Sequence, residues 1–420
     1  MSDAAECRRQ ILKWIERDRA PLVDFYSEFV RKPSPNPPGD TRSAVDHICS
    51  FLTARKAPFV VIAPNKEMPN IVGTFAFANP GRHLALNGHI DVYPVTDPSG
   101  WTRDPFSGDV ADGRVHGRGA ADMKCGTSAS LIAFAYLHQM RDKLAGRITL
   151  SAVSDEETGG RWGTGYLMDH HPEILGDCCL NGEPGSPHVV RVGEKGPLWL
   201  RFTVTGPSGH GGYPQHGDGA IARAARLIVD LHKVTLMSPQ TPQALRAALE
   251  IARPAIELGL GPGVVETVQS VTLNVGKIHG GVKISLKPTE CVFDVDIRLP
   301  IGIDKEAILP HLAEILSRHP DARMEEIIYA APSISDPGGE MVGIIQSNVE
   351  GLKGFRPPAA VSIGGSDTRF WRYRGIPAYI YGPTPTGTGG VNEFVEIEEF
   401  MHVIRTHALS AIDFLSRARS

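Results

Sequence analysis

The chain has 420 residues and a formal net charge of -4. Its length favours roughly two or three domains with an ample hydrophobic core. The slightly acidic balance argues against a basic surface for nucleic acid or membranes, so we expect a small-molecule partner.

The cysteines give no sign of a covalent framework. Six of them lie scattered at positions 7, 49, 125, 178, 179 and 291, without the paired spacing of a disulfide scaffold or a Cys-type zinc cluster. The first residues lack a continuous apolar segment, and no window holds about 18 uninterrupted apolar residues. We therefore expect a cytoplasmic protein in a reducing environment.

Helices and strands alternate through the first half of the chain. Apolar periodicity predicts a helix over residues 3–31, which ends at the Pro-rich stretch 32–39. The strand and helix patterns that follow alternate as in βαβ units, which predicts a three-layer α/β domain. The further elements expected there are helices at 41–55, 125–140 and 162–170, strands at 70–77, 83–86, 148–153 and 177–180, and a loop at 94–119.

The pattern changes near residue 193. A strand at 198–204, a helix at 220–234 and strands at 270–278 and 291–297 predict an inserted α+β domain, with 239–267 as an elaboration of it. Helical patterning returns from Asp304, followed by closing strands near 359 and 376 and a helix at 396–417. We therefore divide the chain into a first catalytic segment, 1–194, an inserted domain, 195–303, and a second catalytic segment, 304–420.

One stretch organises the predicted site. His89 and Asp91 end an apolar run, and their i, i+2 spacing puts both side chains on the same face of an extended segment. Further acids follow at Asp122, Glu156, Glu157 and Glu183. Asp91 and the three glutamates come where apolar runs give way to polar residues, which in an open parallel sheet is the carboxyl edge. One histidine and several converging carboxylates predict a site for a divalent metal ion, whose bound water would have a lowered pKa.

Eight motifs in order resemble the M20 metallopeptidases, the group of acetylornithine deacetylase, succinyl-diaminopimelate desuccinylase, aminoacylase and glutamate carboxypeptidase. The motifs are GHIDVYP, GRGAADMKCG, SDEETGG, NGEPG, GPSGHGGYP, NVGKIHGG, DVDIRLP and GGSDTRF. The resemblance implies a metal-dependent hydrolase of carbon–nitrogen bonds in which His89, Asp122 and Glu183 bind one metal. It also implies that Asp122 bridges to a second metal bound by Glu157. Glu156 would then be the general base, and Asp91 would fix the tautomer of His89.

The resemblance also assigns roles within the insert, which in this family is a ferredoxin-like lid and dimerisation domain. It implies that His210 stabilises the developing oxyanion, often across a homodimer. Asn274 is expected to line the same cleft, and the guanidinium of Arg298 to hold a substrate carboxylate. Simpler interpretations stay open: His210 as a turn residue, Arg298 as a surface charge, and the pair Asp367 and Arg369 as ties at the sheet edge.

The sequence departs from the family pattern near its C-terminus. Gly389 stands where the last metal-binding histidine is expected, in the run Gly389-Gly-Val-Asn392-Glu393. Glycine has no side chain to bind metal, so the second site keeps only Asp122 and Glu157 unless Asn392, Glu393 or water substitutes. We therefore predict one tightly bound ion per chain, zinc or manganese and possibly cobalt, with Asn392 as a substrate contact.

Three functions follow from these residues. The first is hydrolysis of an amide in a small carboxylate such as an N-acyl amino acid or dipeptide. The second is a one-metal aminohydrolase that releases ammonia from an aromatic amine, because Gly389 leaves room for a flat substrate. The third is a non-catalytic relative that binds its ligand without turnover.

Overall fold

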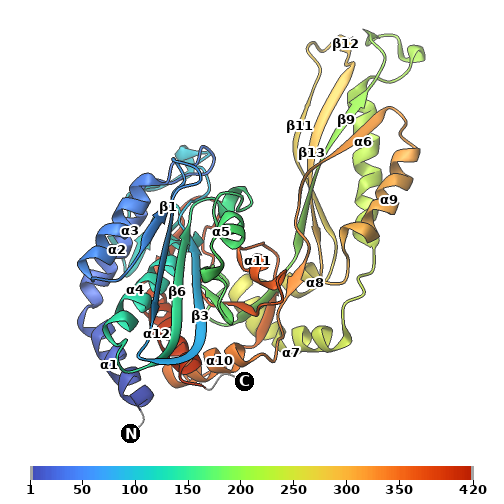
Figure 1. The fold of residues 1–420 in the computed structure, drawn as a ribbon. Coiled ribbons are helices and arrows are strands. Elements are labelled where there is room, and N and C mark those ends of the chain that lie inside the picture. Colours follow the sequence, from blue (N-terminus) through green and yellow to red (C-terminus); the bar gives the residue numbers. More distant parts are fainter. Residues whose placement is uncertain (1–2, 418–420) are drawn as a thin grey trace.

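The computed structural model describes residues 3–417, so residues 1–2 and 418–420 of the two expected catalytic segments lie outside the described part. A large α/β body carries a narrower projecting unit built from the middle of the chain (Figure 1). Within residues 3–417, no helix is both long and apolar enough to cross a membrane.

The body is organised by one mixed sheet of nine strands, in the order β1-β2-β6-β3-β7-β17-β8-β15, with β16 also pairing with β8. β3 runs parallel to both β6 and β7, whereas β1 and β2 form an antiparallel edge. The strands are β1 Val60–Ile62, β2 Asn70–Ala76, β3 Asn79–His89, β6 Ala145–Val153, β7 Cys178–Asn181, β8 Val190–Glu194, β15 Ser333–Ile334, β16 Ala359–Ser362 and β17 Ala378–Ile380.

Helices cover both faces of this sheet (Figure 1). On one face, side chains such as Leu84 and Leu86 pack against α1, α2, α4, α10 and α12. On the other, Ala85 packs with Leu167 of α5 and Trp371 of α11. These opposite sides follow from the two-residue period of a strand, and they confirm the predicted three-layer α/β architecture. The helices are α1 Asp3–Arg17, α2 Arg19–Val30, α3 Arg42–Ala54, α4 Cys125–Gln139, α5 Thr164–His170, α10 Glu340–Lys353, α11 Thr368–Arg372 and α12 Ile397–Leu415.

The helix expected over residues 3–31 is broken into α1 and α2 at Asp18. Pro21 explains the break, because proline has no N–H to donate to the carbonyl four residues earlier. The carboxylate of Asp18 accepts a hydrogen bond from the hydroxyl of Tyr136 at 2.6 Å, which fixes the break against α4.

The projecting unit is a four-stranded antiparallel sheet in the order β11-β13-β9-β14. Its buried residues, including Phe202, Phe293 and Leu227, form a core separate from those of the body. The elements are β9 Gly196–Thr205, β11 Thr272–Gly280, β13 Glu290–Leu299, β14 Ala322–Tyr329, α6 Ala220–Leu231 and α9 Lys305–Ser317, with β10 Gly209–His210 and β12 Leu286–Lys287 at the outer end.

Two boundary expectations were wrong. The insert does not end at residue 303, because α9 packs into the core of the insert and β14 pairs with β9. We propose 196–329 as its extent. Residues 239–267, expected to elaborate the insert, form α7 Gln243–Leu260 and α8 Val264–Val268, and these pack against Val189 and Val361 of the body. Local sequence pattern does not determine which hydrophobic core a helix packs against, so neither the packing of α9 in the insert nor that of α7 and α8 on the body could be predicted from it.

A small sheet lies beside the site. β18 Phe394–Glu396 pairs with β5 Arg114–His116, which pairs with β4 Val110–Ala111. This pairing brings the C-terminal motif with Gly389 and Glu393 next to the turn that carries Asp122.

Candidate active site

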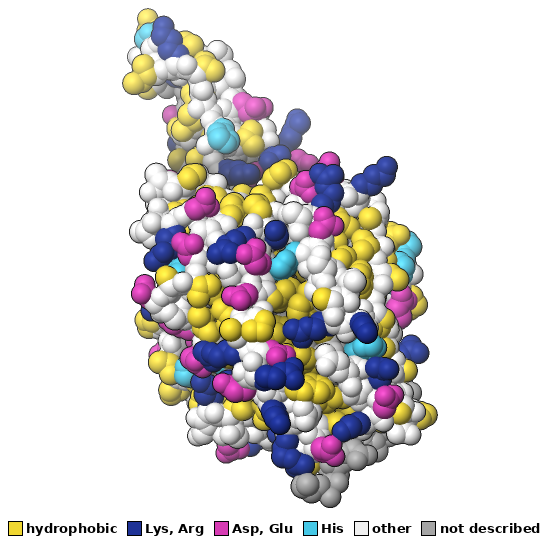
Figure 2. Space-filling view, turned by 90° about the vertical axis from the view of Figure 1, so that its left-hand side faces the viewer, with side chains coloured by type: hydrophobic (Ala, Val, Ile, Leu, Met, Phe, Trp, Pro, Cys, Tyr) yellow, Lys and Arg dark blue, Asp and Glu magenta, His cyan; other side chains and the backbone are white. Residues whose placement is uncertain are grey.

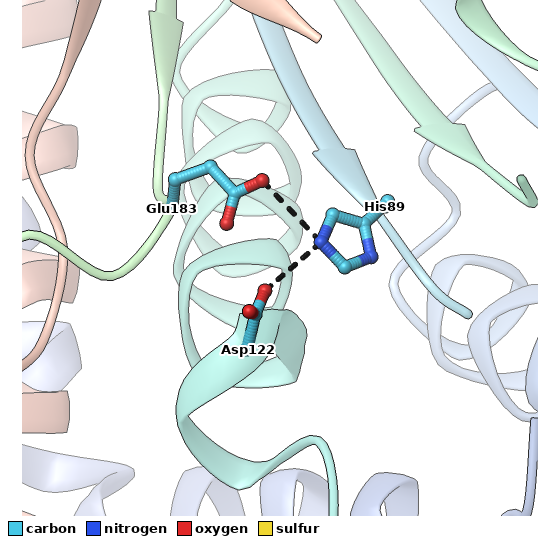
Figure 3. A group of neighbouring side chains, drawn as sticks. All are labelled: His89, Asp122 and Glu183. Carbon is cyan, nitrogen blue, oxygen red and sulfur yellow. Dashed lines mark hydrogen bonds and ion pairs between the residues drawn. The ribbon is translucent and has the colours of Figure 1, made fainter. Parts of the chain in front are cut away.

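Three side chains from distant parts of the sequence meet at the carboxyl edge of the sheet (Figure 3). His89 is the last residue of β3, and Glu183 lies two residues beyond β7, the parallel neighbour of β3. Asp122 lies in the turn before α4. The Nε2 atom of His89 is 3.1 Å from Asp122 Oδ1 and 3.3 Å from Glu183 Oε1. The three ligand atoms all lie within 4.8 Å of one another, which is close enough to share one metal ion.

Asp91 contacts Nδ1 of His89, the ring nitrogen on the side away from Asp122 and Glu183. The Nδ1 atom of His89 is 2.9 Å from the backbone oxygen of Asp91 and 3.4 Å from its Oδ1. The other carboxylate oxygen of Asp91 accepts hydrogen bonds from Asn36 Nδ2 at 2.9 Å and from the backbone N–H of Glu157 at 3.2 Å. Asp91 therefore orients the imidazole and the Glu157 backbone at once, and a fixed imidazole leaves Nε2 facing the ligand position.

The residues present fit a divalent cation. Burial, reinforced by the charge of Asp122, raises the pKa of Glu183 to about 8 and raises the pKa of Glu157 well above its ordinary value. Within residues 3–417, Glu157 Oε1 is buried without a hydrogen-bond partner. Crowded carboxylates of this kind are costly unless a cation compensates them. An imidazole with several carboxylates is a ligand set typical of zinc and manganese.

Glu156 lies beside this cluster and is held by Arg369, from α11. Arg369 Nη1 is 3.2 Å from Glu156 Oε1 and also donates to the carbonyl of Ser366 at 2.6 Å, while Nη2 donates to the carbonyl of Gly159 at 3.1 Å. Both side chains are largely buried, Arg369 with 10% and Glu156 with 12% of the side chain exposed. The sequence predicted for Arg369 only a structural contact at the sheet edge. In the structure this contact is made with Glu156, the expected general base.

Both carboxylate oxygens of Glu393 have other partners. Its carboxylate is paired with Arg118 Nη1 at 2.7 Å and accepts backbone N–H groups from Ala121 at 2.8 Å and from Asp122 at 3.1 Å. Glu393 therefore holds the backbone of the turn that presents Asp122. Burial raises the pKa of Glu393 to about 7.

Asn392 differs from its expected role, whereas Gly389 leaves the open space expected of it. Asn392 Oδ1 accepts hydrogen bonds from the backbone N–H and the hydroxyl of Thr102, so its side chain binds a loop and is no longer available as the expected substrate contact. Gly389 has a φ of +70°, and a Cβ built there meets no atom within 4 Å. The space that a side chain would take at position 389 is thus open.

A cavity of about 680 Å³ extends from Glu156 and Glu157 to the insert. Of the three insert residues with expected roles, only Arg298 lines it. His210 is exposed at the outer end of the insert, where its Nδ1 accepts the N–H of Gly212, and Asn274 is exposed on β11. Within this chain neither residue reaches the cavity. The lining residues are Tyr93, Glu156, Glu157, Thr158, Gly159, Glu194, Lys195, Pro197, Trp199, Arg298, Ile328, Tyr329, Ala330, Ala331, Gly365, Arg369, Phe370 and Tyr373.

Comparison with known proteins agrees with this architecture. Residues 85–412 match the family described as Peptidase family M20/M25/M40. A succinyl-diaminopimelate desuccinylase of Cereibacter sphaeroides is 29% identical over 388 residues, covering 90% of this chain and 94% of the relative. Another, from Rhodospirillum centenum, is 27% identical over 394 residues, covering 91% and 94%.

Solved structures share the fold at low sequence identity. An M20 family metallo-carboxypeptidase from Sulfolobus solfataricus superimposes with a TM-score of 0.79 at 18% identity, covering 94% of this chain and 99% of its own. The di-peptidase Dug1p of Saccharomyces cerevisiae gives a TM-score of 0.79 at 15% identity over the full length of both chains. The chain therefore belongs to peptidase family M20/M25/M40 and is a metal-dependent hydrolase acting on carbon–nitrogen bonds.

Proposed function

We propose that this enzyme hydrolyses the amide bond of a small substrate that carries a carboxylate, such as an N-acyl amino acid or a dipeptide. The observation that carries the proposal is the shared cavity, which joins Glu156, beside the metal-ligand cluster, to the guanidinium of Arg298. A carboxylate bound at Arg298 would direct the rest of the substrate toward Glu156.

The residues divide the work in the following way. His89, Asp122 and Glu183 would hold one ion of zinc or manganese, possibly cobalt, which supplies Lewis-acid polarisation of the scissile carbonyl. Glu156 accepts a proton from the attacking water and delivers it to the leaving nitrogen. Asp91 keeps the imidazole of His89 in the tautomer that binds through Nε2.

We propose one tightly held ion per chain. The second position has Asp122 and Glu157, but Gly389 supplies no side chain and the carboxylate of Glu393 is bound to Arg118 and to backbone N–H groups. Elemental analysis of the purified protein tests this, since two ions that survive dialysis against a weak chelator would contradict it.

We further propose that the enzyme is a homodimer joined through the insert. Hydrophobic side chains lie at the outer end of the projecting unit (Figure 2), and those of Val282 and Ile284 are almost fully exposed. Such surfaces mark interaction sites. A dimer would allow His210 of the partner subunit to approach the cavity that His210 of the same chain does not reach. Light scattering tests the dimer, and Ile284→Glu should make the protein monomeric.

The distribution of the cysteines bears on the cellular compartment of the enzyme. The six cysteines are scattered along the chain without paired spacing, and five of them lie in the body core or pack against it. Scattered cysteines of this kind suit a reducing compartment, so we propose the cytoplasm.

A substrate panel tests the proposed reaction against the aminohydrolase alternative, which the open space at Gly389 favours. The panel contains N-acyl amino acids, dipeptides and aminobenzoates, each assayed with added zinc or manganese. Cleavage of the first two supports amide hydrolysis, whereas ammonia release from aminobenzoates alone would replace it by the aminohydrolase reaction. Glu156→Gln should abolish either activity and serves as the control for contaminating enzymes.

A further inference from the structure

Aromatic side chains make up much of the cavity wall that faces the expected carboxylate-binding residue, Arg298. Five aromatic side chains line it: Tyr93, Trp199, Tyr329, Phe370 and Tyr373. The hydroxyl of Tyr373 donates to the carbonyl of Ala331 at 2.6 Å, and that of Tyr329 accepts the N–H of Lys305 at 3.3 Å. Because these hydroxyls are bound to the protein backbone, the two residues offer a ligand mainly ring surface, and the Lys305 ammonium, 4.7 Å from the Tyr329 ring centroid, covers part of that ring.

Most of the cationic groups in the cavity are already occupied. Lys195 Nζ donates to the carbonyls of Thr267 at 2.9 Å and Ser270 at 2.7 Å and to the hydroxyl of Thr272 at 3.0 Å, which uses all three of its N–H groups. Arg369 is bound to Glu156 and to backbone carbonyls. Neither cation is available for an additional substrate carboxylate.

Arg298 is the exception. Its Nε is held by Asp296 at 2.8 Å, and within residues 3–417 its two Nη groups have no hydrogen-bond partner. Asp296 also accepts the indole N–H of Trp199 at 2.8 Å. One carboxylate therefore fixes a guanidinium and an aromatic ring side by side in the same cavity.

The acidic residue on this wall adds no unpaired charge. Glu194 is 3.1 Å from Arg372 and accepts the hydroxyl of Ser366 at 2.6 Å. Away from the metal-ligand cluster and within residues 3–417, the cavity therefore has one cation with free donors, Arg298, and its acid, Glu194, is already paired. A substrate with several charged groups would have no partners there for most of them. An apolar group, by contrast, would exchange water for aromatic surface.

From this arrangement we infer that the enzyme selects amides with a single carboxylate next to an aromatic or other bulky apolar side chain. Arg298 binds the carboxylate, and Trp199 with Tyr329, Phe370 and Tyr373 contacts the side chain. The inference rests on the proposed amide hydrolysis and names its substrate class. The inferred substrate differs from succinyl-diaminopimelate, which gives the desuccinylase relatives their name and carries several charges.

Hydrolysis of matched amides tests the inference. We expect kcat/KM for N-acetyl-L-phenylalanine to exceed those for N-acetyl-L-alanine, N-acetyl-L-glutamate and N-succinyl-LL-diaminopimelate by at least about tenfold, the usual discrimination of a hydrophobic pocket. Equal or higher kcat/KM for the alanine, glutamate or succinyl substrate would overturn it.

A binding measurement separates this inference from the proposed reaction. By calorimetry, 3-phenylpropanoate should bind at least about tenfold more tightly than propanoate, because only the former fills the aromatic wall. If 3-phenylpropanoate shows this preference but no amide is cleaved, the proposed reaction fails and the assigned specificity stands. If amides are cleaved without preference for the phenyl group, the specificity fails and the reaction stands.

Variants of Trp199 locate the effect. Trp199→Ala should lower the ratio of kcat/KM for the phenylalanine and alanine substrates by about tenfold, whereas Trp199→Phe, which keeps a ring, should retain most of it. Circular dichroism confirms that both variants fold. If the ratio is unchanged in Trp199→Ala, the ring does not determine specificity.

Discussion

Replacing Glu393 by glutamine should destabilise the protein far more than the same replacement at Glu396, three residues along the chain. Each glutamate pairs with an arginine at 2.7 Å, Glu393 with Arg118 and Glu396 with Arg114. The two pairs differ in solvent exposure: the side chains are 3% and 0% exposed in the first pair, and 41% and 42% exposed in the second.

The difference in burial sets the expected magnitudes. Removing one partner of a buried ion pair leaves an uncompensated charge and costs about 3–5 kcal/mol. Glu393→Gln would leave Arg118 in that state and would also weaken the carboxylate hydrogen bonds to the N–H groups of Ala121 and Asp122. An exposed pair contributes about 0–1 kcal/mol, since water solvates each partner.

Urea denaturation of the two variants and the wild type at about pH 8.5 measures this difference in the free energy of unfolding, because Glu393, whose pKa is about 7, is ionised there. The double variant Glu393→Gln/Arg118→Met should recover part of the loss, because it removes the stranded charge. Glu393→Gln should also weaken zinc binding, since Glu393 holds the turn that carries Asp122, and Glu396→Gln should not. If the two single variants differ by less than about 1 kcal/mol, the reasoning from burial is refuted.

Three further predictions concern the metal, the base and the pH response. His89→Ala should lose the tightly bound ion, whereas Glu157→Gln should keep it, as measured by elemental analysis. Arg369→Met should lower kcat by about a hundredfold with KM changed by less than about threefold, because Arg369 positions the carboxylate of Glu156, and Arg369→Lys should restore part of kcat. His407, whose pKa burial lowers to about 4, should make the protein less stable as pH falls from about 6.5 to about 4, by roughly 3 kcal/mol.

The sign of the pH effect follows from linkage. In this pH range the unfolded chain takes up a proton on the imidazole, whereas the folded protein keeps His407 neutral, with Nε2 donating to the carbonyl of Tyr381 at 2.7 Å. His407→Gln should therefore flatten the dependence of the unfolding free energy on pH between 4 and 6.5. If the slope of unfolding free energy against pH is unchanged in His407→Gln, the titration does not belong to His407. Loss of the ion in Glu157→Gln would contradict the assignment of the metal ligands. An unchanged kcat in Arg369→Met would show that Glu156 does not need Arg369 to position it.

The sequence was informative wherever function depends on residue type and local period. His89 could be placed at a strand end because an apolar run stops there, and Glu183 because a second run stops in the same way. Parallel neighbours end at one edge of a sheet, so the meeting of these two residues followed from the strand pattern alone. The three-layer body followed from the alternation of strands and helices.

The boundaries of the insert did not follow, for a physical reason. α9 begins at a normal capping residue, Asp304, whose side chain accepts the N–H of Ala307 at 2.9 Å. Capping and amphipathic period determine that a helix forms, but they carry no information about which hydrophobic core receives its apolar face. That depends on β14, which pairs with a strand more than 100 residues earlier in the chain.

The chemical inventory of this protein and the sheet edge at which the metal ligands gather could be predicted, since both depend on residue identity and short-range pattern. Which charges are already satisfied became visible only in the folded chain: Arg118 pairs with Glu393, backbone carbonyls bind Lys195, and Arg369 pairs with Glu156. These pairings join residues 72 to 275 positions apart, and a hydrogen bond depends on distances of a few tenths of an ångström that no local sequence pattern encodes.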